Sequence, residues 1–299
     1  MDWPVRRAPT RSERRHEKIR HLFGPGYSTR LDWIEMPSDA GSSVRKKHEA
    51  VPLPIWLELL AGVEVLFLRV SPIYWGFGVP RGDGSAVILV PGFMMPDLYL
   101  TELKAWLART GYRPYFSGIG WNSDCPNLMI RNRLVATIRK AQKATGRPVH
   151  LIGHSLGGVI ARAMAAQMPE SVASVITLAS PFRGVAAHRS ILRLSEWVRT
   201  RIHRRHGASV LPECYTSACT CSFLESIAGD FPGQVGQTAV YTKSDGIVDW
   251  QVCRTGDDSI DCEVSATHLG LVFNPIVYEL IGQRLSTAQK RARKPRRCA

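Results

Sequence analysis

The seven residues Ile152-Gly153-His154-Ser155-Leu156-Gly157-Gly158 lie where an apolar run ends and a helical pattern begins. The run before them, residues 148–152, has the length and composition of a short buried strand. After them, apolar residues recur at helical spacing until Pro169 ends the run. The glycines allow a tight turn and close backbone packing. The stretch therefore predicts a strand, a sharp turn at Ser155 and a helix.

Such a turn suits a serine nucleophile. A serine hydroxyl is a weak nucleophile, so a catalytic one is held where a histidine takes its proton and backbone N–H groups reach the developing oxyanion. A chance loop is the ordinary explanation of a bare G-x-S-x-G pattern, because glycine and serine are common. The strand before the turn, the helix after it and the extra glycine at Gly158 favour a nucleophile at Ser155.

The G-H-S-x-G-G form of this motif resembles the nucleophile elbow of α/β-hydrolases of the bacterial lipase and esterase type. The resemblance covers motifs in order from the strand before Pro91 to the helix after Pro275, and leaves the first and last segments unexplained. It implies a mostly parallel sheet with helices on both faces and a cap insertion. It also implies the chain order nucleophile, acid, histidine, which places the acid and the base after Ser155.

Two loops downstream match the expected acid and base. Asp245 stands in an S-D-G-x-V pattern after an apolar run, where lipases have the triad acid. Asp-Gly turns are common in any protein, and Asp249 is the alternative acid. His268 lies between the last strand-like piece and the helix-like run from Pro275, where the family has its general base. The other histidines lie in basic or polar surroundings, in the strand before the elbow or in the elbow itself.

The family supplies one oxyanion N–H from the residue after the nucleophile and a second from the loop after an earlier strand. Here these donors are Leu156 and Phe93, with Met94 as the adjacent alternative. A Pro-Gly pair after a strand is also an ordinary turn. Four apolar side chains in the loops are expected either to line an acyl pocket or to be ordinary core: Met94, Met95, Trp121 and Phe182.

Strand-like and helix-like runs alternate through a chain of 299 residues with 44% hydrophobic composition. The strand-like runs lie near 86–90, 112–118, 148–152, 172–179, 237–242 and 260–266. The helix-like runs lie near 97–110, 128–145, 155–168 and 275–285. This alternation predicts an α/β fold. We predict a basic, partly flexible N-terminal segment (1–50), a hydrolase domain (51–285) with a cap at 183–235, and a basic C-terminal tail (286–299).

The formal net charge of +14 is concentrated at the two ends of the chain. Residues 1–30 carry eight Lys or Arg against three acids, residues 284–299 carry seven against none, and the residues between hold 24 bases and 22 acids. A nearly neutral body argues against sequence-specific nucleic-acid binding. The ends are expected to meet anionic lipid headgroups, acidic proteins or nucleic acid without base readout, or to serve only as solvated ends.

The apolar stretch 55–75 has two interpretations. It is interrupted by three charged residues: Glu58, Glu64 and Arg69. These charges and a following proline argue against a membrane-spanning helix. A helix that covers the edge of the core is favoured, and monotopic membrane contact is the alternative.

A basic stretch lies inside the expected cap. Residues 183–207 contain seven arginines and one acid, with apolar residues at helical spacing. This candidate lid helix is expected to dock its apolar face on the protein's own core, and contact with an anionic lipid surface is the alternative.

Seven cysteines, an odd number, give no simple disulfide framework. Cys253 and Cys262 flank a polar loop and either bridge it or stay free in a reducing compartment. The cysteines within 214–221 have irregular spacing, which disfavours a zinc site with His206. No nucleotide-binding glycine loop is present in the sequence. We predict no metal and no cofactor.

The resemblance implies a serine hydrolase that cleaves carboxylic esters of acyl or lipid type through Ser155, Asp245 and His268. An acyltransferase or thioesterase shares these parts, because the triad does not record the leaving group or the acceptor. A non-catalytic hydrolase-like binding protein is the alternative from another class. The Arg-rich start of the chain does not resemble a secretory signal, which predicts cytoplasmic residence, free or at a membrane surface.

Overall fold

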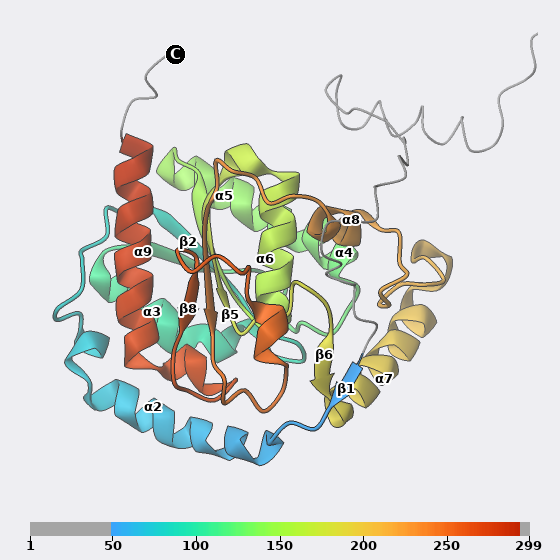
Figure 1. Ribbon diagram of the computed structural model, residues 1–299. Coiled ribbons are helices and arrows are strands. Elements are labelled where there is room, and N and C mark those ends of the chain that lie inside the picture. Colours follow the sequence, from blue (N-terminus) through green and yellow to red (C-terminus); the bar gives the residue numbers. More distant parts are fainter. Residues whose placement is uncertain (1–48, 294–299) are drawn as a thin grey trace, which may run out of the picture. The chain divides into compact units, whose positions relative to one another are not determined.

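The computed structural model describes residues 49–293, and its centre is a parallel β-sheet (Figure 1). Within that part of the chain the sheet has six strands in the order β3-β2-β4-β5-β7-β8, and every neighbouring pair is parallel. The strands are β2 (Ala86–Val90), β3 (Arg113–Phe116), β4 (Val149–His154), β5 (Val172–Leu178), β7 (Gly236–Tyr241) and β8 (Asp261–Glu263). Each strand overlaps a predicted strand-like run, which confirms the predicted parallel sheet.

Helices precede, follow and connect these strands. The α-helices are α2 (Ala61–Val70), α3 (Thr101–Thr110), α4 (Pro126–Met129), α5 (Val135–Thr145), α6 (Leu156–Gln167), α7 (Arg189–His206), α8 (Ser222–Ala228) and α9 (Pro275–Arg293). The short helices are η1 (Ile55–Leu60), η2 (Pro72–Trp75), η3 (Asp97–Leu100), the π-helical turn η4 (Ile130–Leu134), η5 (Pro169–Ser171), η6 (Gly207–Ser209), η7 (Trp250–Cys253) and η8 (Gly270–Phe273).

The sheet is buried on both faces. Side chains of a strand alternate between its two sides, and all five residues of β2 are buried. Ile88 packs in a cluster with α5, α6 and α8, whereas its neighbour Leu89 packs in a second cluster with α3 and α9 (Figure 1). Because helices cover both faces, the central strand β2 is a continuous apolar run rather than an alternating one. This arrangement is the predicted α/β layering.

Parallel pairing brings the carboxyl ends of the strands to one edge of the sheet. The loop that begins at Pro91 follows β2, and Ser155 directly follows β4. Asp245 follows β7, and His268 follows β8. Residues separated by more than 170 positions in sequence are therefore assembled at one edge, which is where open α/β sheets hold their ligands.

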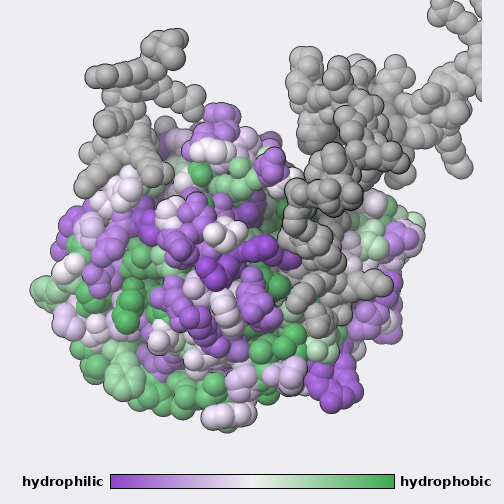
Figure 2. Space-filling view, in the orientation of Figure 1, coloured by the Kyte–Doolittle hydropathy of each residue, from purple (hydrophilic) through white to green (hydrophobic). Residues whose placement is uncertain are grey.

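The segment before the sheet buries one side against the core and exposes many apolar side chains on the other. Leu68 and Tyr74 are buried against the core, which agrees with the prediction of a helix at the core edge. Nine large hydrophobic side chains of this segment are nevertheless 46–84% exposed: Trp56, Leu59, Leu60, Val63, Leu66, Phe67, Val70, Trp75 and Phe77. Val63, Leu66, Phe67 and Val70 lie on α2, and the other five lie in the flanking segments 56–60 and 75–77; we call all nine together the apolar face of α2. Hydrophobic colouring gathers along the lower edge of Figure 2, where Figure 1 places α2.

The described residues do not include any helix with the length and apolar character that a membrane span requires.

The interval 183–235, predicted as a cap, contains α7, α8 and the strand β6 (Ala186–His188). β6 pairs in parallel with β1 (Glu49–Val51). The sequence did not predict these strands, because three residues are too few to show a period. Val198 and Ile202 of α7 are buried with Cys125 and Cys214. The apolar face of α7 therefore docks on the protein itself, as the favoured interpretation predicted.

The last helix is longer than predicted. The sequence placed its end near Leu285, but α9 continues to Arg293. No proline or glycine occurs between Leu285 and Pro295, so nothing in the local sequence stops the helix earlier. The first half of the predicted tail 286–299 is thus helical. Residues 294–299, and all but the last two residues of the predicted segment 1–50, lie outside the described residues.

Candidate active site

Ser155 occupies a sharp turn between β4 and α6, as predicted. Its backbone has φ 52° and ψ −125°, a conformation that L-residues rarely adopt. Its N–H donates to the carbonyl of Leu178 at 2.8 Å, and the residue is 8% exposed. Gly157 has no room for a side chain, because a Cβ there would lie 2.2 Å from the carbonyl oxygen of Val90. The glycine after the serine therefore lets the elbow pack directly on β2.

Asp245 and His268 form a buried pair. The Nδ1 atom of His268 lies 2.7 Å from Asp245 Oδ2, and each residue is 2% exposed. The other carboxylate oxygen, Oδ1, accepts the N–H groups of Ile247 and Val248, both at 2.8 Å. An acid that accepts on both oxygens is fixed in orientation and favours a proton on Nδ1 of the imidazole. This arrangement leaves Nε2 of His268 as its basic atom.

The environment of His268 acts on its pKa in two directions. Burial, the largest effect, lowers the pKa because it disfavours the imidazolium. The charge and hydrogen bond of Asp245, together with the charge of Glu58, outweigh burial and raise the pKa above its usual value of 6.5. The site therefore stabilises the protonated histidine that a general base becomes.

Asp249, the alternative acid, has another role in the structure. Its Oδ1 accepts the N–H of Gln251 at 2.9 Å and caps η7. Asp245, and not Asp249, is the carboxylate hydrogen-bonded to His268.

The elbow and the histidine loop are in direct contact. His154 immediately precedes Ser155, and its Nε2 lies 3.0 Å from the carbonyl oxygen of His268. The two imidazole rings have centroids 4.9 Å apart. Burial, followed by the charge of His268, lowers the pKa of His154 to about 3, so this ring is neutral and donates from Nε2. His154 thus links the candidate nucleophile to the loop of the candidate base.

The loop after β2 also lies against Ser155. A Cβ built at Gly92 would lie 3.2 Å from Ser155 Cβ and 2.8 Å from His154 Nδ1, so this position requires glycine. The N–H of Met94 already donates to the carbonyl of Asn122 at 2.8 Å, which disfavours Met94 as an oxyanion donor. Phe93 remains the predicted donor from this loop. Leu156 is the first residue of α6, where N–H groups have no partner within the helix.

The four side chains predicted to line an acyl pocket lie in different environments. Met94 packs beside α7, and Met95 is partly buried. Phe182 is part of the core cluster under α6 and lies beneath the guanidinium of Arg162, so it corresponds to the ordinary-core interpretation. Trp121 is 61% exposed. The assignment of an acyl pocket to these residues stays a prediction.

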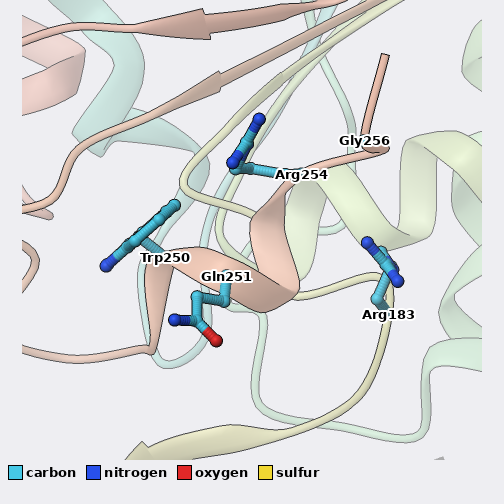
Figure 3. Close-up of a pocket in the computed structure, with 5 residues that line it drawn as sticks. All are labelled: Arg183, Trp250, Gln251, Arg254 and Gly256. Atoms are coloured by element: carbon cyan, nitrogen blue, oxygen red, sulfur yellow. The ribbon is translucent and has the colours of Figure 1, made fainter. Parts of the chain in front are cut away.

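A cavity of about 280 Å³ lies between Arg183 and the segment 250–256, which contains η7 and follows the loop of Asp245. The residues that line it are labelled in Figure 3: Arg183, Trp250, Gln251, Arg254 and Gly256. The guanidinium of Arg254 stacks over the ring of Tyr241 at 5.2 Å, and its Nε lies 3.5 Å from Asp261 Oδ2. None of the predicted acyl-pocket side chains lines this cavity.

Sequence reasoning missed two carboxylates that contact the catalytic loops. Glu58 on η1 accepts backbone N–H groups of Gly246, His268 and Leu269. Glu64 on α2 accepts the N–H and the hydroxyl of Thr267. The available signal was the occurrence of two acids in an otherwise apolar stretch. We interpreted these acids from the sequence only as evidence against a membrane-spanning helix.

Within residues 49–293, no group of three or more His, Cys, Asp or Glu side chains is placed to hold a metal ion. His206 is hydrogen-bonded to Asp124, with its Nε2 2.7 Å from Asp124 Oδ1. Cys214 contacts Cys125, with the two sulfur atoms 3.3 Å apart. Cys253 and Cys262 are both free thiols in the structure, which corresponds to the second of the two interpretations of this pair.

Parts of the chain are similar in sequence to known proteins that are named as lipases or thioesterases. The family model of palmitoyl protein thioesterases matches residues 127–240, which include Ser155. A triacylglycerol lipase of Burkholderia plantarii is 33% identical over 133 residues, which is 42% of this chain and 37% of the lipase. A triacylglycerol lipase of Pseudarthrobacter phenanthrenivorans is 36% identical over 106 residues, or 33% of each chain. The chain thus spans about a third of the length of these two relatives.

Among solved structures, a naproxen esterase (carboxylesterase NP) from Bacillus subtilis is 15% identical, with a TM-score of 0.42. The match covers 78% of this chain and 96% of the esterase. The parallel sheet, the turn at Ser155 and the pairing of Asp245 with His268 after later strands agree with the resemblance stated from the sequence. The chain is therefore an α/β-hydrolase-fold protein similar to lipases and esterases.

Proposed function

We propose that the chain is a serine hydrolase that cleaves carboxylic esters. The observation that carries this proposal is the buried Asp245–His268 pair, which contacts the elbow where Ser155 has a positive φ. A histidine whose Nδ1 is held by a carboxylate has its Nε2 available to a serine hydroxyl. The partial sequence similarity to triacylglycerol lipases supports the same chemistry.

The reaction follows from the roles of these groups. Nε2 of His268 takes the hydroxyl proton of Ser155 while the serine oxygen bonds to the acyl carbon, and the N–H groups of Leu156 and Phe93 hold the oxyanion. When the bond to the leaving group breaks, His268 returns the proton to the departing alcohol. Water then attacks the acyl-enzyme with His268 as the base, which releases the acid and restores the Ser155 hydroxyl.

A long-chain acyl thioester is the second candidate substrate. The match of residues 127–240 to palmitoyl protein thioesterases favours it. The same acyl-enzyme forms from an ester or a thioester, because only the leaving group differs.

We also propose that the protein contacts a lipid surface peripherally. The apolar face of α2 supports contact through this element, because its nine large hydrophobic residues are all exposed. The two acids of the segment, Glu58 and Glu64, are bound to backbone N–H groups on its inner side. The basic ends of the chain, at 1–30 and 284–299, would add attraction to anionic headgroups.

The test of hydrolysis combines turnover with covalent labelling. The substrates are p-nitrophenyl esters of increasing chain length and a palmitoyl thioester, and the serine probe is a fluorophosphonate. We expect the folded wild type to be labelled and to turn over the esters, and Ser155→Ala to do neither. A folded wild type that resists the probe and releases no product from any substrate refutes the proposal. Faster turnover of the thioester than of the matched ester selects the second candidate.

A further inference from the structure

Glu58 lies on η1, outside the strands and loops that carry the candidate triad. If the chain is the proposed hydrolase, we infer that Glu58 is a positioning residue that holds the acid loop and the histidine loop in one fixed arrangement. The inference rests on the proposed function. It adds Glu58, as a positioning residue, to the three side chains of the candidate triad.

One buried carboxylate joins both loops. Oε1 of Glu58 accepts the N–H of Gly246, next to the acid, and the N–H of His268, both at 3.0 Å. Its Oε2 accepts the N–H of Leu269 at 2.8 Å. The residue is 9% exposed, so water has little access to replace these contacts. Because charge-assisted hydrogen bonds are about twice as strong as neutral ones, this carboxylate strongly constrains both loops.

The glycine after the acid is explained by this contact. A Cβ built at Gly246 would lie 2.9 Å from Glu58 Oε1 and 2.8 Å from the carbonyl oxygen of Pro54. Any larger residue would push the acid loop away from η1. The glycine of the S-D-G pattern therefore allows the carboxylate of Glu58 to approach the backbone beside Asp245.

Glu58 also contributes charge at the base. The groups that face His268 and its loop come from five elements. Asp245 follows β7, Glu58 lies on η1 and His154 lies at the elbow. Glu64 on α2 and Tyr99 on η3 contact the neighbouring residues Thr267 and Leu269. Asp245 and Glu58 are the anions that raise the pKa of His268. Glu58 thus favours the imidazolium that forms when Ser155 loses its proton.

The chain offers a matched control for Glu58. Glu64 lies on the adjoining helix and binds a backbone N–H of the same histidine loop, at Thr267. It accepts no hydrogen bond from the acid loop among the contacts of the described residues. Glu58→Gln and Glu64→Gln therefore remove the same chemical group from the same side of the loop, but only the first disconnects the two loops.

The experiment measures kcat, KM and the pH dependence of kcat/KM on a soluble short-chain p-nitrophenyl ester. For Glu58→Gln we expect kcat to fall by about 10²-fold with little change in KM, because a small misplacement of catalytic groups costs this much. We also expect the acid limb of its kcat/KM profile to move to lower pH, because the loss of the Glu58 charge lowers the pKa of His268. Glu64→Gln should keep the acid limb of the wild type. A Glu58→Gln variant with wild-type kcat and acid limb overturns the inference.

Two further measurements cover the other outcomes. If Glu58→Gln does not fold, Glu58→Asp keeps the charge but shortens the reach. Reduced kcat with an unmoved acid limb supports the inference, and wild-type kcat overturns it. If the wild type hydrolyses no ester, the proposed function fails separately, and titration of His268 by NMR still applies. A lower pKa of His268 in Glu58→Gln supports positioning by Glu58, and an equal pKa refutes it.

Discussion

The backbone N–H of His268 donates to Glu58 Oε1 at 3.0 Å, although the two residues lie 210 positions apart. The helical segment before the sheet is therefore part of the framework of the candidate site. Its inner face binds the catalytic loops through Glu58 and Glu64, and its outer face carries exposed apolar side chains. Substitutions on the two faces should have separable effects, the inner ones on catalysis and the outer ones on contact with lipid.

Ser155 should be essential for turnover, and its positive φ should lower the stability of the fold. Ser155→Ala should lower kcat by roughly 10⁴-fold or more, because the nucleophile is lost. Ser155→Gly should be equally inactive but more stable than Ser155→Ala by about 1 kcal/mol, since glycine relieves the positive φ at this position. Ester turnover and urea unfolding measure the two effects. Equal stability of the two variants would mean that the elbow stores no strain.

Asp245 and Asp249 should differ sharply when each is changed to asparagine. Asp245→Asn should lower kcat by about 10⁴-fold, because the amide no longer holds His268 in the productive tautomer. Asp249→Asn keeps a side-chain oxygen that can accept the N–H of Gln251 and cap η7, so it should change stability by less than about 1 kcal/mol while turnover stays close to that of the wild type. Steady-state kinetics of both variants provide the comparison. A larger loss of kcat in Asp249→Asn would reverse the assignment of the acid.

The pH dependence of activity should follow His268. A general base acts when neutral, so kcat/KM should rise with pH through the pKa of this residue. Because Asp245 and Glu58 raise that pKa against the effect of burial, the midpoint should lie above the ordinary value of 6.5. Measurement of kcat/KM from about pH 5 to about pH 9 gives the midpoint. A midpoint below 6.5 would indicate that burial dominates.

Gly157 provides a test of the packing at the elbow, and Gly62 in α2 is the glycine with which it is compared. Gly157→Ala would place a Cβ 2.2 Å from the carbonyl oxygen of Val90, so we expect a loss of about 1–3 kcal/mol or more in unfolding free energy and a loss of turnover. Gly62 in α2 has no atom within 4 Å of an added Cβ, and Gly62→Ala should stabilise the protein by about 0.5–1 kcal/mol. Thermal unfolding of both variants makes the comparison. A neutral Gly157→Ala would show that the elbow can move away from β2.

The main elements of the fold could be predicted because their local signals were strong. The central strands β2 and β4 are fully buried, and the elbow combines a strand, glycines and a helix within a few residues. Asp245 and His268 followed from a resemblance that fixes their order in the chain. Their contact at 2.7 Å is a fact of the structure that no local pattern contains.

Other features depend on contacts between distant segments, which sequence patterns do not record. Glu58 appeared only as a charge within an apolar run, and its partners lie about 200 residues away. The core position of Phe182 depends on Arg162 above it, on a different element. β1 and β6 are stabilised by pairing with each other, and three-residue strands show no period of their own.

The apolar face of α2 should determine binding to lipid surfaces. Replacement of Leu59 and Phe67 by serine removes two exposed apolar side chains and should lower binding to phosphatidylglycerol-containing liposomes by about tenfold or more, because each buried side chain of this size contributes about 1.5–3 kcal/mol. A Ser155→Ala background keeps the vesicles intact during cosedimentation. Trp197→Ser, on the exposed side of α7, is the matched control and should bind as before. A chain that lacks residues 294–299 separates the contribution of the basic end. If the double variant binds like its parent, or if light scattering shows a parent dimer that this variant dissociates, the apolar face has another partner and the lipid proposal is wrong.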